Sequence, residues 1–221
     1  MASDEKLLEE IQSEYHLLKE EMSEVLYAKT NNEIECVFYK NSRKSYLPHT
    51  HPKHLIIGHI QRGKCYIIIN GEERAYERGD EFQIMPNTIH EIRPADGSSY
   101  SMMVMCIKTE TIVKDEVLKE LQENIMEKPE DDYLISEMAA DSQMSLYNMI
   151  RKFKKTFGLT PHQFQIQCKV RKAQKLLGTD KNISEVAYEA GFYDQSHLDR
   201  CFQKIVNLTP RNYQSILVKN N

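Results

Sequence analysis

The chain has 221 residues, enough for two domains of ordinary size that each bury a hydrophobic core. Its composition, 40% hydrophobic and 28% charged with 8 Gly and 7 Pro, excludes a disordered or fibrous protein. The net charge of −4 argues against a nucleic-acid partner for the chain taken as a whole.

Neither a targeting segment nor a cysteine framework is visible. Residues 1–33 are rich in Glu and Lys, and no run of about 18 apolar residues occurs anywhere, so we expect a cytoplasmic protein with no membrane partner. The cysteines are odd in number and widely spaced, which predicts core thiols rather than disulfides or a thiolate zinc site. They are Cys36, Cys65, Cys106, Cys168 and Cys201.

Residues 4–28 have the spacing of an amphipathic helix. Their apolar residues alternate three and four apart, as positions a and d of a coiled coil do: Leu8, Ile11, Tyr15, Leu18, Met22 and Val25. Glu14 and Lys19 then occupy positions g and e, with charges that attract across a parallel dimer. The pattern predicts an N-terminal helix over residues 1–32 that pairs two chains. A helix packed on its own domain is the alternative.

From Glu33 to Lys108 the pattern changes to short β-rich runs separated by turns. Asn70-Gly71 is the strongest hairpin signal. Short strands at this spacing predict a small barrel or jelly roll, here over residues 33–110. The expected strands are Ile34–Tyr39, Leu55–Gln61, Cys65–Ile69, Glu81–Met85, His90–Arg93 and Tyr100–Ile107.

From Ile112 onward the pattern is helical to the end of the chain. We therefore expect an α+β protein of two domains, with an N-terminal helix and a β-barrel followed by an all-α domain over residues 111–221. Almost no linker separates the halves, so they should be mechanically coupled.

The charge is distributed unevenly. Residues 1–111 carry 13 Lys+Arg and 18 Asp+Glu, a net −5, whereas residues 112–221 carry 16 and 15, a net +1. Residues 142–179 contain no acid and eight cations: Arg151, Lys152, Lys154, Lys155, Lys169, Arg171, Lys172 and Lys175. Such a stretch is typical of a phosphate-binding surface, although a solvated helix face has the same composition.

Residues 133–158 contain the parts of a helix-turn-helix unit. Leu134–Asp141 is a first helix with Ala139 as its small packing residue, and Ser142 to Met144 form the turn. Ser145 then caps a second helix, Leu146–Phe157, whose Met149 and Phe153 point inward.

The same arrangement recurs at residues 183–206. Ile183–Ala190, with Ala187 in the small position, precedes a Gly191-Phe192 turn and a helix around Ser196–Val206. Arg151 and Arg200 each stand two residues before a Phe. One helix-turn-helix pattern is weak, but a duplicated one is hard to obtain by chance.

On these residues the chain resembles the AraC/XylS family of transcription regulators. The matching pieces are MAADSQMSLYNMIRKFKKTFGLTPHQF, KVRKAQKLL and ISEVAYEAGFYDQSHLDRCFQKIVNLTPRNY. The resemblance implies a seven-helix DNA-binding domain in which a central helix, Pro161–Leu177, places two recognition helices in successive major grooves. Gln143, Ile150 and Gln214 depart from the family pattern, at the first turn, at an exposed position and after the last Tyr.

A weaker resemblance, to the cupin-like sensor domain of that family, rests on HTHPKHLIIGHIQRGK and GDEFQIMPNTIHEI. It implies an effector pocket reached by His49, His51 and His90, with His59 nearby. In metal-binding cupins these three histidines act with a Glu, whose position is filled here by Leu55 or Ile56. We expect no metal and no other cofactor. A divalent ion held by three imidazoles and exposed loop histidines are the alternatives.

The DNA contacts are assigned from side-chain chemistry and from the resemblance. Arg151 and Arg200 suit guanine and Gln195 suits adenine, while an intramolecular salt bridge is the alternative for the two arginines. Arg171 matches a structural Arg inside the central helix. The remaining candidates are Tyr147, Ile150 and Ser196 for the groove and Lys154, Lys155 and Lys169 for phosphates.

Three functions follow from these patterns. The first is a transcription regulator and not an enzyme, with double-stranded promoter DNA, a small-molecule effector, a second copy of the chain and RNA polymerase as candidate partners. The second is a metal-dependent cupin enzyme fused to a DNA-binding domain, which the missing Glu disfavours. The third is a constitutive DNA binder whose β-domain only dimerises.

Overall fold

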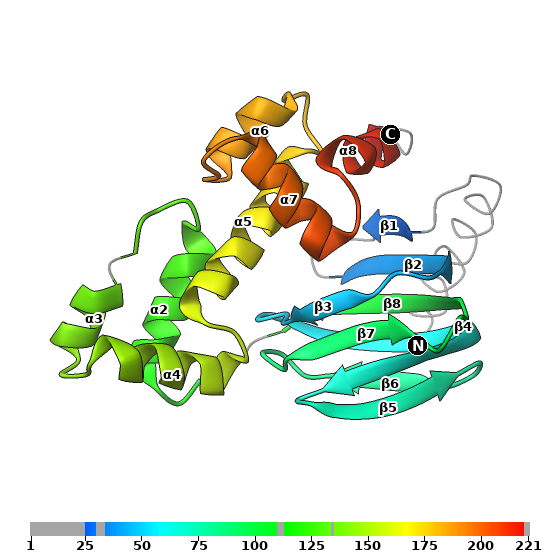
Figure 1. Cartoon of the computed structure of the whole chain (residues 1–221), viewed down its shortest axis with the longest axis horizontal. Coiled ribbons are helices and arrows are strands. Elements are labelled where there is room, and N and C mark those ends of the chain that lie inside the picture. The colour runs from blue at the N-terminus through cyan, green and yellow to red at the C-terminus, as the bar shows by residue number, and fades with distance from the viewer. Residues whose placement is uncertain (1–24, 30–33, 110–112, 134, 219–221) are drawn as a thin grey trace, which may run out of the picture.

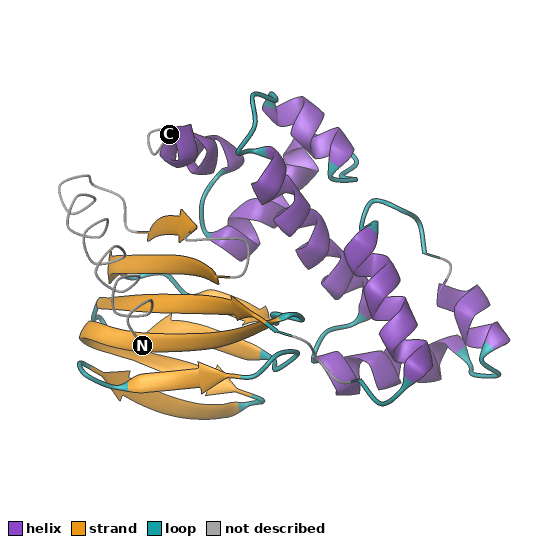
Figure 2. Ribbon diagram, turned by 180° about the vertical axis from the view of Figure 1, so that it is seen from behind, coloured by secondary structure: helices purple, strands orange, loops and turns teal. Residues whose placement is uncertain are grey.

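The computed structural model describes residues 25–29, 34–109, 113–133 and 135–218. Figure 1 shows a curled β-sheet beside a group of helices, with the strands in the first half of the chain and the helices in the second. Figure 2 shows the same division from behind. The expected fold class, a cupin-like sheet followed by an all-α domain, is confirmed.

The β-half is one eight-stranded antiparallel sheet with the order β1-β2-β8-β4-β7-β3, in which β5 and β6 also pair with β4. Its long central strand β4 pairs with β8 and β6 along its first part and with β7 and β5 along its second. The strands are β1 Val25–Lys29, β2 Ile34–Ser42, β3 Tyr46–His49, β4 His54–Ile69, β5 Glu72–Glu77, β6 Glu81–Ile84, β7 His90–Pro94 and β8 Tyr100–Lys108.

Strand β4 joins two segments that the sequence pattern separates. Ile56 and Ile60 are buried before the bend, and Cys65 and Ile67 after it, so the inward-facing positions switch from even to odd numbers. The switch coincides with a shift of register against β8 between Ile60 and Arg62. Gly63, directly after it, has φ +77°, and a Cβ there would lie 1.9 Å from the Ser99 carbonyl oxygen. Only glycine fits this position, and it lets the strand change direction without leaving the sheet.

Three strands differ from expectation. The prediction of a helix over residues 4–28 is wrong at its end, because Val25–Lys29 forms β1. This strand pairs with β2 from Val25↔Tyr39 to Lys29↔Glu35. Pairing with the edge of the sheet satisfies the backbone N–H and C=O groups of β1, and the spacing of apolar residues does not predict such pairing. The rest of that helix lies outside the described residues. Strands β3 and β5 were not expected, because β3 contains a Pro and β5 is almost entirely polar.

The hairpin predicted at Asn70-Gly71 is confirmed. It connects β4 to β5, whose register runs from Ile69↔Glu72 to Lys64↔Glu77. Asn70 and Gly71 have φ values of 53° and 87°, as a two-residue type I′ turn requires.

The helical half packs around two cores that share one helix, α5. Phe164 and Cys168 of α5 belong to the core of α2 to α4, and Val170 and Ala173 belong to the core of α6 to α8. The two helix-turn-helix units therefore lie at opposite ends of α5 (Figure 1). The described helices are α2 Glu116–Glu127, α3 Ile135–Asp141, α4 Leu146–Phe157, α5 Pro161–Leu176, α6 Ile183–Glu189, α7 Gln195–Val206 and α8 Pro210–Val218.

Side-chain caps fix where these helices begin. Ser145 accepts a hydrogen bond from the Asn148 backbone N–H at the start of α4, and Asp194 caps α7 in the same way. Thr160 and Gln163 form a capping box at α5, next to Pro161. These local signals make the helix starts readable from sequence.

No helix among the described residues is long and apolar enough to cross a membrane. All five cysteines are free thiols, and all except Cys201 are buried.

Candidate DNA-binding surface and histidine cluster

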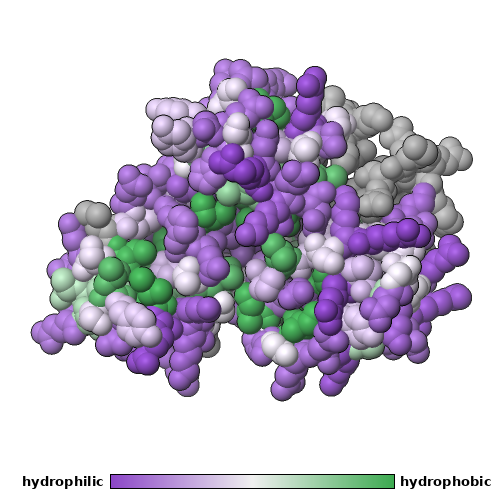
Figure 3. Space-filling view, viewed as in Figure 1, coloured by the Kyte–Doolittle hydropathy of each residue, from purple (hydrophilic) through white to green (hydrophobic). Residues whose placement is uncertain are grey.

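Helix α4 presents a polar, positively charged face on an apolar base. Met149, Phe153 and Phe157 are fully buried, which fixes the rotation of the helix on the rest of its unit. The opposite face exposes Arg151, Lys154 and Lys155, and Tyr147 is 73% exposed. Ile150 is half-buried. Figure 3 shows apolar surface over the α3–α4 unit.

Helix α7 repeats this arrangement. Leu198, Phe202 and Val206 are buried, whereas Gln195 and Arg200 are exposed together with Ser196. Arg151 is the sixth residue of α4 and Arg200 is the sixth residue of α7, so the two guanidinium groups occupy equivalent places in the two units. The Gln195 amide oxygen accepts a hydrogen bond from the Ser184 hydroxyl at 3.0 Å.

Neither arginine forms an ion pair with another described residue. Within the described part of the chain, Arg151 donates a 3.5 Å hydrogen bond to the Asn148 side chain on its own helix. The intramolecular salt bridge considered from sequence is therefore absent from the described part of the chain, and both groups are open to a ligand.

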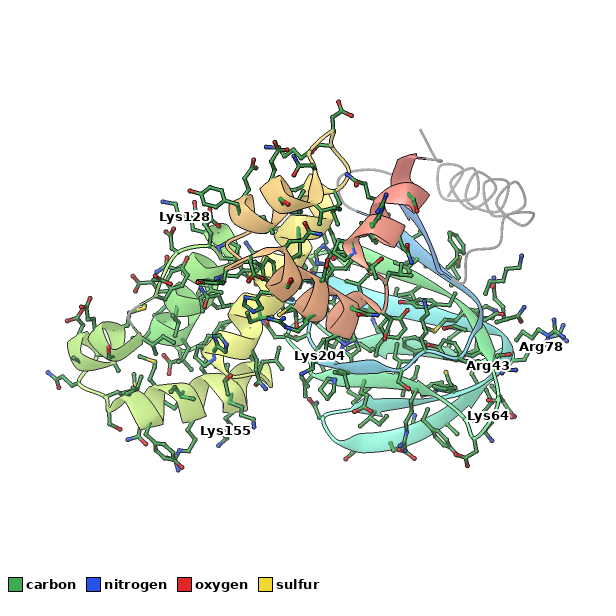
Figure 4. The ribbon with its side chains drawn as sticks, turned by 45° about the horizontal axis from the view of Figure 1, so that its top comes forward. Arg43, Lys64, Arg78, Lys128, Lys155 and Lys204 are labelled. Carbon is green, nitrogen blue, oxygen red and sulfur yellow. The ribbon has the colours of Figure 1, made fainter. Side chains whose placement is uncertain are left out.

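Seven of the eight cations of residues 142–179 divide into two groups, and the eighth, Arg171, contacts the β-half. Lys169 donates to the Gly191 carbonyl at 2.8 Å, and Lys172 lies 2.6 Å from Glu130, so these two hold α5 to its neighbours. The position of Lys169 thus favours packing over phosphate contact. The exposed cations are Arg151, Lys152, Lys154, Lys155 and Lys175. Figure 4 shows Lys155 on α4 and Lys204 on α7.

Three histidines of the β-half lie together, and we call His49, His51 and His90 the histidine cluster. His49 ends β3 and pairs with His90, which begins β7. The ring centroids of His49 and His90 are 4.2 Å apart, and that of His51 is 5.2 Å from each. One ring nitrogen of each residue lies within 4.8 Å of the other two. His90 is buried, and the other two are half-buried.

The hydrogen bonds of the cluster determine where each ring carries its proton. His49 Nδ1 lies 2.7 Å from the Leu47 carbonyl oxygen, and His90 Nδ1 lies 3.0 Å from that of Thr88. A carbonyl only accepts, so both Nδ1 atoms donate and both Nε2 atoms keep a lone pair. His51 Nδ1 lies 2.8 Å from Arg171 Nη2. A guanidinium only donates, so His51 Nδ1 accepts and its Nε2 carries the proton.

The cluster is neutral near pH 7. Burial, followed by the charge of His90, lowers the pKa of His49 well below its usual value. Burial and the Arg171 guanidinium do the same to the pKa of His51. Burial lowers the pKa of His90 to about 4.

The cluster also lies where the two halves of the chain meet. Gln167 of α5 accepts from the Thr50 backbone N–H at 3.2 Å and donates to the Thr50 carbonyl at 2.5 Å. Arg171, one helical turn further along, donates to the same carbonyl at 3.1 Å. Thr50 is the residue between His49 and His51, so the cluster and the central helix share one backbone segment.

Further contacts complete this interface. Gln122 of α2 donates to the Asn87 side chain at 2.7 Å, and Asn207 at the end of α7 donates to the Ser45 carbonyl at 2.8 Å. Ile89 packs against the core of α2 to α4 and beside Gly158, the left-handed cap of α4. The segments before His49 and before His90 therefore both touch the helical half.

Sequence reasoning found the three clustered histidines but missed their partners. Arg171 was expected to be a structural residue of the central helix, whereas its guanidinium reaches the sensor half; Gln167 and Thr50 were not singled out. The one available signal was the i, i+4 spacing of Gln167 and Arg171, which places both side chains on the same face of the helix. His59 lies outside the cluster, on β4, with its Nδ1 3.8 Å from the Glu81 carboxylate.

Comparison with known families assigns both halves. The model of an AraC-like ligand binding domain matches residues 31–111, and that of a helix-turn-helix domain matches residues 138–216. The chain belongs to the AraC/XylS family.

Proteins similar to this AraC/XylS protein include two named as transcriptional regulators. The HTH-type transcriptional regulator MtrA of Neisseria gonorrhoeae is 32% identical over 102 residues, covering 46% of this chain and 34% of MtrA. The HTH-type transcriptional activator RhaS of Klebsiella pneumoniae is 31% identical over 77 residues, covering 34% of this chain and 28% of RhaS. The alignments thus span about a third or less of the curated relatives' length.

The fold of both halves together has a solved counterpart. ToxT of Vibrio cholerae superposes with a TM-score of 0.62 at 10% sequence identity, covering 84% of this chain and 99% of the ToxT chain. This likeness shows the two-domain fold.

Proposed function

We propose that the chain is a sequence-specific transcription regulator that binds double-stranded promoter DNA through α4 and α7. The observation that carries the proposal is the duplication: two capped helices present an exposed Arg at the same position, and α5 joins both units. A rigid connection of this kind suits two successive major grooves. Such a protein acts where promoter DNA is, which in a bacterium is the cytoplasm.

The contacts follow from the exposed face of each helix. Arg151 and Arg200 suit bidentate bonds to guanine O6 and N7, and Gln195 suits adenine. Tyr147, Ile150 and Ser196 line the same faces and would add apolar or single hydrogen-bond contacts. Lys154 and Lys155, near the end of α4, suit phosphates, which set the register of the protein on the duplex.

DNA affinity is expected to fall steeply with salt. Each phosphate neutralised by a Lys or Arg contributes about −0.9 to the slope of log K against log salt concentration, so the exposed cations of α4 predict a slope steeper than about −2. Fluorescence anisotropy with a labelled duplex between low and physiological salt measures it. A slope near zero would contradict the proposal that these cations bind phosphates.

The β-half is proposed to sense a small-molecule effector at the histidine cluster rather than to catalyse a reaction. The support is positional, since the cluster shares Thr50 with the interface to the DNA-binding half. An effector that moves this segment changes its packing against α5 directly. RNA polymerase is proposed as the further partner through which DNA binding changes transcription.

The chain is proposed to act as a homodimer through the heptad seam predicted in residues 4–28, of which the end, from Val25 onward, forms β1 instead. We expect Ile11→Glu with Leu18→Glu to shift the protein toward monomer in light scattering, because both changes place charges on the seam. Ser13→Glu with His16→Glu adds the same number of carboxylates off the seam and should leave the mass unchanged. A seam variant as dimeric as the unsubstituted chain would refute this role.

A further inference from the structure

We propose that the histidine cluster binds a divalent transition-metal ion such as Zn²⁺, and that this binding is incompatible with the hydrogen bond from Arg171 to His51. Metal binding would then loosen the contact between the sensor half and α5. The inference names a ligand class for the sensor site, and its consequence for DNA rests on the proposed function.

The donor set fits such an ion. Neutral imidazole is a common ligand of Zn²⁺ and of other late transition metals, and three imidazoles with one open position form a known kind of site. His49 and His90 are already oriented for this role, since each donates its Nδ1–H to a backbone carbonyl and points the Nε2 lone pair elsewhere. At a metal–nitrogen distance of about 2.1 Å, two nitrogens bound to one ion are no more than about 4.2 Å apart. The ring nitrogens, now within 4.8 Å of one another, would therefore have to move closer together to bind the same ion.

His51 creates the conflict. Its Nδ1 lone pair accepts from Arg171, and its proton is on Nε2. An ion that binds Nδ1 takes the lone pair that Arg171 uses. An ion that binds Nε2 displaces that proton to Nδ1, where the new N–H meets the N–H of Arg171 at 2.8 Å. In both arrangements the hydrogen bond is lost, and the ring stays neutral.

Charge acts in the same direction. The Arg171 guanidinium is a fixed positive charge in contact with the cluster, so it repels a divalent cation there. Arg171 therefore competes with the metal. Loss of its hydrogen bond to His51 would remove one of the four polar links between Thr50–His51 and α5; the other three are two from Gln167 and one from Arg171 to the Thr50 carbonyl. Because α5 belongs to both cores of the DNA-binding half, its displacement would move both recognition helices relative to the sensor.

The test is a calorimetric titration of Zn²⁺ into the untagged full chain after removal of metals by a chelator. We expect one ion per chain, no binding at the cluster in His51→Ala, and affinity about 10-fold or more higher in Arg171→Met, since a hydrogen bond to a charged group no longer has to break. Lys172→Met removes a neighbouring charge of the same helix that pairs with Glu130 instead, and should bind as the unsubstituted chain does.

His59→Ala removes a histidine outside the cluster and should also leave Zn²⁺ affinity unchanged. Arg171→Gln is the second variant should Arg171→Met not fold, and it should again bind Zn²⁺ more tightly. The proposal would be overturned if the Arg171 variants bound Zn²⁺ no more tightly than the unsubstituted chain. It would also be overturned if His51→Ala bound Zn²⁺ as tightly as the unsubstituted chain.

DNA affinity is measured in parallel, with and without Zn²⁺. We expect Zn²⁺ to change the affinity of the unsubstituted chain and not that of Arg171→Met, which already lacks the link. Zn²⁺ binding with the expected variant pattern but no DNA binding under any condition would refute the proposed function alone. DNA binding without Zn²⁺ binding would refute the metal site alone.

Discussion

Arg151→Ala and Arg200→Ala should each weaken binding to the best operator by about 1–3 kcal/mol, which is roughly 5- to 150-fold, and each should relax discrimination at one base position. Both side chains are exposed, at the same position of their helices, and unpaired with any described carboxylate. The two relaxed positions should fall in different halves of the site. Binding measured against a set of singly mutated operators gives both quantities.

Lys155→Ala is the matched comparison for these arginines. It removes an exposed cation from the same face of α4 without a proposed base contact, so it should weaken all sequences alike and reduce the salt slope by about 1. Arginine variants that behave like Lys155→Ala would mean that Arg151 and Arg200 contact phosphates only.

Phe153→Ala and Phe202→Ala should each lower the free energy of unfolding of the helical half by about 3–5 kcal/mol, because each leaves a cavity where a fully buried ring was packed. Phe153 contacts Phe157 and Phe164 at centroid distances of 4.5 and 5.7 Å, and Phe202 contacts Tyr213 at 5.4 Å. Urea unfolding followed by circular dichroism measures the loss.

Each Phe has a control two residues away. Arg151→Ala and Arg200→Ala remove exposed side chains of the same helices and should change the free energy of unfolding by no more than about 0.5 kcal/mol. Phe variants as stable as these Arg variants would show that the inward faces of α4 and α7 are assigned wrongly.

The helical half was predictable because its signals are local. Ser145 and Pro161 mark helix starts that the structure reproduces, and the inward Phe residues follow from the helical period. The β-half was harder. The polar strand β5 forms because β4 supplies an edge with which it pairs. Strand β1 forms in place of the end of the predicted helix because β2 supplies such an edge.

The histidine cluster likewise has a part that was predictable from sequence and a part that was not. His49, His51 and His90 were found because two short motifs resemble those of cupins. Their link to Arg171 joins residues 120 positions apart, and no local pattern encodes it. Whether a cation near the end of a helix faces DNA, a neighbouring helix or another domain depends on how the domains pack. The contacts of Lys169 and Arg171 lie on other elements and could therefore not be read from sequence, whereas the exposure of Arg151 follows from the period of its own helix.

A hydroxyl-radical footprint shows whether one chain reads two successive major grooves. The duplex is selected by the protein from a random pool, so that no operator has to be assumed. We expect two protected segments for one DNA-binding half, on one face of the duplex and centred about one helical turn, 10–10.5 base pairs, apart. Arg200→Ala should weaken one segment and Arg151→Ala the other. A single protected segment that both substitutions weaken equally, or no protection at all, would mean that α4 and α7 do not enter successive major grooves.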